Sequence, residues 1–136
     1  MSEKKTVVFK NGDYAIELTV VEAAVRQDIH REALMFRERT AMPDLEEGAP
    51  MEEFVRRSYL TVSYPTCIAA TTEVKVIEKG KKGISLDMTS AEFLELPAAL
   101  VRLWSTAVWE LNPMWSPFFD LSSLTETEEE TGSTEN

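Results

Sequence analysis

Few residues in this 136-residue chain could do chemistry, and they are scattered. The chain holds one histidine, His30, and one cysteine, Cys67. A paired cysteine and histidine could form a nucleophilic centre, in which the imidazole activates the thiol, but neither residue lies in a motif of such an enzyme. His30 lies between Ile29 and Arg31 in a predicted helix, which favours a residue at the solvent edge over a catalytic base. We therefore predict no catalytic residue and a protein that is not an enzyme.

Metal and cofactor sites are not indicated either. A metal site needs several Cys or His ligands at fixed spacing, and this chain has one of each. It has no glycine-rich phosphate loop and no nucleophile elbow. The acid pairs Glu46-Glu47 and Glu52-Glu53 fall in a predicted loop and at a predicted helix start, where they usually serve solvation and the helix dipole. We expect no cofactor and no bound metal.

The charge excludes some classes of partner. The net charge is −10, which argues against nucleic-acid binding by electrostatics. Residues 120–136 carry six acids and no base, and after Leu124 almost every residue is Thr, Glu, Ser, Gly or Asn. Such a segment has no apolar area to offset chain entropy. We expect one globular domain over 1–119 and a disordered acidic tail over 120–136, with a solubilising role or, alternatively, a role as a docking arm.

The sequence also predicts neither a membrane span nor a secretion signal. No apolar run reaches the roughly 18 residues that span a bilayer, and Met-Ser-Glu-Lys-Lys is not followed by an apolar signal core. The single cysteine excludes an internal disulfide and suits a reducing cytosol. We expect a cytoplasmic protein without a membrane partner.

The predicted elements give a mainly helical α+β fold, with an N-terminal β-hairpin packed on three to four helices. Asn11-Gly12 predicts the hairpin turn over 6–19. A capping box at Thr19–Glu22 predicts a helix to about Thr40. Apolar residues fall on one face of this helix, which is an amphipathic pattern: Val21, Val25, Ile29, Ala33 and Phe36.

A second helix is expected from Pro50, with a break or restart at Tyr64-Pro65. Residues 72–88 alternate apolar and polar side chains, which favours a second small hairpin around 79–83, the alternative being an exposed loop. The lysines near that turn indicate a solvated turn rather than an anion site. A capping box at Thr89–Glu92 precedes a last helix over 97–111.

The three tryptophans lie in or just after this last helix. Trp104 falls on its apolar stripe and is expected in the core. Trp109 lies five residues on, about 140° around the helix, so it is either an interface anchor or part of a second packed face. Trp115 either folds back on the helix or projects to a partner. The residues expected to bind a partner are Trp109, Met114, Trp115, Phe118 and Phe119.

Three segments resemble the tail assembly chaperones of long-tailed bacteriophages and prophages. They are Tyr64-Pro-Thr-Cys-Ile-Ala-Ala-Thr71, Glu92-Phe-Leu-Glu-Leu-Pro97 and Trp104-Ser-Thr-Ala-Val-Trp-Glu-Leu-Asn-Pro-Met-Trp115. The resemblance implies a non-enzymatic helper in the bacterial host cytoplasm that self-associates, binds the tape measure protein and helps recruit the tail tube protein. The family folds are mostly helical, so the hairpin is a departure. The alternative is a virion structural component, such as a minor tail or connector protein.

Overall fold

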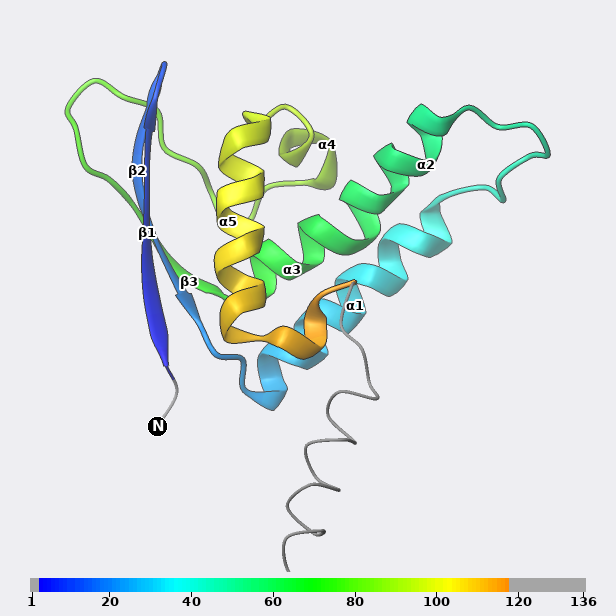
Figure 1. Ribbon diagram of the computed structural model, residues 1–136, viewed down its shortest axis with the longest axis horizontal. Helices are drawn as coiled ribbons and strands as arrows, with labels where there is room; N and C mark the ends of the chain where they lie inside the picture. The colour runs from blue at the N-terminus through cyan, green and yellow to red at the C-terminus, as the bar shows by residue number, and fades with distance from the viewer. Residues whose placement is uncertain (1–2, 118–136) are drawn as a thin grey trace, which may run out of the picture.

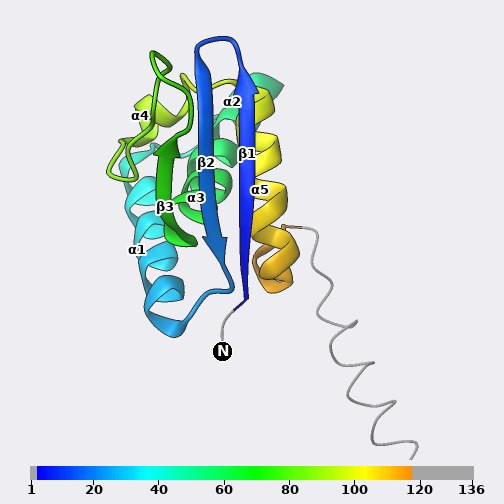
Figure 2. The ribbon, with the colours of Figure 1, turned by 90° about the vertical axis from the view of Figure 1, so that its left-hand side faces the viewer.

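The computed structural model describes residues 3–117, whose strands form one antiparallel sheet (Figure 1). Strand β1 spans Lys4–Asn11, β2 spans Tyr14–Val21 and β3 spans Thr71–Val76, in the order β1-β2-β3. The helices lie behind one face of the sheet, and the other face is open in the view of Figure 2. The predicted α+β class is therefore confirmed.

The N-terminal hairpin forms as its turn residues predict. β1 and β2 pair from Lys4 opposite Val21 to Asn11 opposite Tyr14. Gly12 has φ of 59°, the left-handed region that glycine enters without a Cβ clash. One face of the hairpin supplies core residues, namely Val7, Phe9, Ile16, Leu18 and Val20.

The second hairpin expected over 72–88 does not form. β3 instead pairs with β2, with Val76 opposite Ile16, and residues 77–88 contain no strand. The returning chain makes one bridge to the first hairpin, where the Lys82 N–H donates to the Asp13 carbonyl at 2.7 Å. The pairing with β2 satisfies backbone groups along the second edge of that strand.

Helix α1 spans Val25–Ala41, so the start predicted at Thr19 is wrong. Thr19 lies inside β2 opposite Thr6, because the β-branched residues that follow it continue the strand. The helix begins after Ala24, whose N–H donates to the Gln27 side-chain oxygen at 2.7 Å. A local capping signature was therefore overridden by strand pairing.

Of the two alternatives predicted at Tyr64-Pro65, the structure has the restart and not the break, because a new α-helix begins at Tyr64 without a gap. Helix α2 (Met51–Ser58) runs through a π-helical turn, η1 (Tyr59–Ser63), into α3 (Tyr64–Ala69). The Tyr64 N–H reaches the Tyr59 carbonyl, five residues back, just before proline removes the next donor.

Two further helices complete the fold. Helix α4 spans Ser90–Phe93 and α5 spans Ala98–Leu111, followed by a 3₁₀ turn, η2, at Pro113–Trp115. The predicted capping box at Thr89 is confirmed: its hydroxyl accepts from the Glu92 N–H at 3.2 Å.

Helix α5 packs on β1 and β2 and carries the centre of the core. Trp104 is fully buried, as predicted, and its indole N–H donates to the Thr71 hydroxyl at 2.8 Å. No helix within residues 3–117 combines the length and apolar character needed to cross a bilayer. The expected acidic tail lies outside the described residues.

Candidate protein-binding surface

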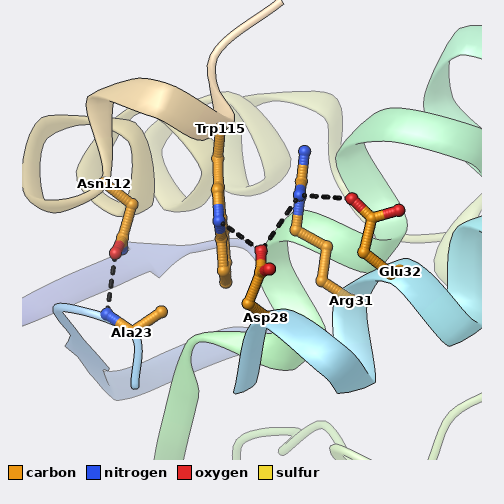
Figure 3. Close-up of polar contacts among 6 residues, drawn as sticks. All are labelled: Ala23, Asp28, Arg31, Glu32, Asn112 and Trp115. Atoms are coloured by element: carbon orange, nitrogen blue, oxygen red, sulfur yellow. Dashed lines mark hydrogen bonds and ion pairs between the residues drawn. The ribbon is translucent and has the colours of Figure 1, made fainter. Parts of the chain in front are cut away.

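The last turn of the described chain is fixed on helix α1 (Figure 3). Trp115 is 7% exposed, and its indole N–H donates to Asp28 Oδ1 at 3.0 Å. The Arg31 guanidinium carbon lies 4.7 Å from the centre of the Trp115 ring, a cation–π distance. Trp115, expected either to fold back on the last helix or to project to a partner, instead lies against α1.

Arg31 is the charged centre of this contact. Its guanidinium lies 3.5 Å from Asp28 and 3.4 Å from Glu32, and its Nε is buried without a hydrogen-bond partner. Burial lowers the pKa of Arg31 below its ordinary value, while Glu32 and Asp28 oppose that change. The cluster joins η2 to α1 by a charge-assisted network.

Asn112 makes a second attachment at the same end of the molecule. Its Oδ1 accepts from the Ala23 N–H at 2.7 Å, and its Nδ2 donates to the Val21 and Val108 carbonyls at 2.9 and 3.0 Å. The Asn112 side chain thus caps the end of α5 and fixes the connection between β2 and α1 to it. Two of its partners, Ala23 and Val21, lie about 90 residues away in the chain, so no local sequence signal could identify these contacts.

The other residues expected to bind a partner occupy different positions. Trp109 is half-buried and lines a groove of about 290 Å³ between α5 and the α2–η1 segment, which Val55 and Tyr59 also line. Met114 is 65% exposed. Phe118 and Phe119 lie outside the described residues. The structure therefore leaves Met114, and part of Trp109, accessible to a partner.

Helix α1 carries an apolar face that points outward. Val25 is 76% exposed, Ile29 63% and Phe36 69%. At about 100° per residue, these side chains lie within about 40° of one another around the helix axis. We call these three residues the α1 stripe. A helix of this pattern ordinarily packs by its apolar face, but α1 turns other residues inward: Gln27, Leu34, Met35 and Glu38.

The α1 stripe continues toward the exposed methionine. Val25 and Met114 line the same open groove of about 580 Å³. Its lining also includes Leu111 and four charged residues, namely Glu22, Asp28, Arg31 and Glu32. Exposed apolar patches with a polar rim are typical of protein-binding surfaces. The candidate surface therefore comprises the α1 stripe and Met114.

The residues weighed for chemistry are not brought into a catalytic arrangement. Cys67 is fully buried in α3, and burial raises the pKa of its thiol well above the ordinary value, which disfavours the reactive thiolate. His30 is exposed on α1. Within residues 3–117, no three Cys, His, Asp or Glu side chains gather as metal ligands.

Comparison of the chain with protein families, with curated proteins and with solved structures gives no significant match.

Proposed function

We propose that this protein is a non-enzymatic assembly chaperone for the tail of a long-tailed bacteriophage or prophage. It binds the tape measure protein in the host cytoplasm and helps to recruit tail tube subunits. The family resemblance of three sequence segments supplies the kind of partner, and the exposed α1 stripe supplies a surface for it.

The observation that carries the proposal is the outward position of Val25, Ile29 and Phe36. Three large apolar side chains exposed on one helix face lower the solubility of a protein, so such a patch usually marks a contact with another molecule. A tape measure protein is a long helical chain, and a helix that lies along an apolar helix face is a common mode of recognition. A chaperone of this kind would shield such a chain before the tail tube forms around it.

The first test is the position of the gene and the fate of the protein. We expect the gene to lie between the tail tube gene and the tape measure gene. Full-length protein co-expressed with the tagged tape measure protein should co-purify with it, while mass spectrometry of purified virions should find none of it. Failure to co-purify would reject the proposed function. Stoichiometric presence in virions would favour the structural component.

A further inference from the structure

Helix α1 carries a small net positive charge, although the protein as a whole is acidic. Helix α1 contains four arginines and three acids, whereas the whole chain has a net charge of −10. Arg26 and Arg39 are exposed near the two ends of the stripe, and neither makes an ion pair within the part of the chain that the structure describes.

Each acid of α1 has a partner, but the side chains of Asp28 and Glu32 remain 51% and 60% exposed. Glu38 is buried beside Arg37 at 3.5 Å, Glu32 pairs with Arg31, and Asp28 accepts from Trp115. With four arginines and three acids, α1 has a net charge of +1, and Arg26 and Arg39 are its exposed arginines without an ion pair among residues 3–117. Opposite charges beside an apolar contact steer association and select the partner.

The dimensions of the stripe fit a helix. Val25 and Phe36 are eleven residues apart, about 16 Å along the axis at about 1.5 Å per residue. That length is three turns, and helical ligands are commonly held by anchors spaced over two to three turns.

We propose that the α1 stripe binds an amphipathic helix of the partner whose apolar side is flanked by acidic residues. The acids face Arg26 and Arg39, and the apolar side chains cover Val25, Ile29 and Phe36. This inference rests on the proposed function, since the partner tested is the tape measure protein. It adds the surface, the conformation and the charge of the segment bound.

A second copy of the chain is a poorer occupant. Its α1 would bring the same arginines and no additional free acids, and in an antiparallel pair Arg26 would approach Arg37 of the other copy. Two chains with a net charge of −10 also repel each other. Residues 118–136 of the chain itself contain both apolar and acidic residues, so the experiment must distinguish them from a partner.

The experiment uses full-length protein and overlapping synthetic peptides that cover the tape measure protein encoded nearby. Binding is measured by fluorescence anisotropy. We expect the binding peptides to be amphipathic helices with acidic flanks. The double variant Ile29→Ser with Phe36→Ser should weaken binding by about 30-fold or more. Arg26→Glu should weaken it about three- to tenfold at low salt, with a smaller effect at high salt.

The matched control is Leu103→Ser, which replaces an exposed apolar residue on α5; it should bind like the unmodified protein. A photo-cross-linking residue at position 36 then identifies the occupant. Cross-links to the acidic helical peptide support the proposal, whereas cross-links only to a second copy or to residues 118–136 overturn it.

Different experimental outcomes would reject the proposed function and the helix-binding inference. If the intact tape measure protein does not co-purify and no peptide binds, the proposed function falls and this inference falls with it. If the partner binds but the Ile29 and Phe36 variant binds equally well, or the bound peptides are basic or extended, only this inference is overturned.

Discussion

The indole N–H of Trp115 donates to the Asp28 carboxylate at 3.0 Å, although 87 residues separate them in the chain. This bond orients the first turns of α1 against the last turn of the described chain. Together with the Asn112 contacts, it attaches the N-terminal end of α1 to the segment that ends α5.

The Trp115 hydrogen bond should contribute measurably to stability. Trp115→Phe keeps an aromatic ring but removes the N–H donor to a carboxylate, so we expect a loss of about 1.5–3 kcal/mol in the free energy of unfolding. Trp109→Phe is the matched control, because the Trp109 indole nitrogen has no hydrogen-bond partner. Chemical denaturation of both variants checks this, and equal losses would contradict the assigned bond.

Trp104 should be needed for folding. It is fully buried and hydrogen-bonded to Thr71, and truncation of a buried aromatic side chain costs about 3–5 kcal/mol. We expect Trp104→Ala to lose most of the native stability of a small domain. Circular dichroism during thermal unfolding measures the loss. A midpoint near that of the unmodified protein would exclude Trp104 from the core.

The capping box predicts a pH dependence. The backbone and side-chain hydrogen bonds from Thr89 lower the pKa of Glu92 below its ordinary value. Because the folded pKa is the lower one, the contribution is present above the unfolded pKa and is lost as pH falls through the folded pKa. An NMR titration should find Glu92 titrating below an ordinary glutamate in the intact protein. Thr89→Ala should return the pKa toward the ordinary value, and no change on this substitution would contradict the assignment.

Removal of residues 125–136 should leave the thermal midpoint nearly unchanged. This expectation comes from composition alone, since the segment offers almost no apolar side chain to a core. Differential scanning calorimetry of the truncated and full-length chains compares the midpoints. A drop of several degrees would mean that the acidic segment contributes to the folded domain.

The sequence predicted correctly those elements that depend on residues close together in the chain. The Asn11-Gly12 turn and the Thr89–Glu92 capping box both depend on residues within a few positions of each other. The Thr19 signal failed because Val20 and Val21 gain strand pairs with Lys5 and Lys4. The pairing of β3 with β2 joins segments more than 50 residues apart, so alternation in 72–88 could not identify its partner.

The candidate surface was only partly predictable. Met114, predicted to bind a partner, is exposed. Trp115, predicted to do the same, is buried on α1, where it contacts Asp28 and Arg31. The spacing of Val25, Ile29 and Phe36 showed that they share one helix face, but it did not show whether that face points to the core or to solvent. Leu34 and Met35 on the other side of α1 supplied a second apolar pair, and packing against α3 and η1 determined which side is buried.

Both proposals require that α1 presents its apolar stripe to solvent. The decisive measurement is the free energy of unfolding of the Ile29→Ser and Phe36→Ser double variant, compared with Leu34→Ser. Since the stripe is exposed and Leu34 is buried, the double variant should stay within about 1 kcal/mol of the unmodified protein. Leu34→Ser should lose about 2–5 kcal/mol. The opposite order, with the double variant unfolding and Leu34→Ser stable, would show that the stripe is core and would remove the surface on which both proposals depend.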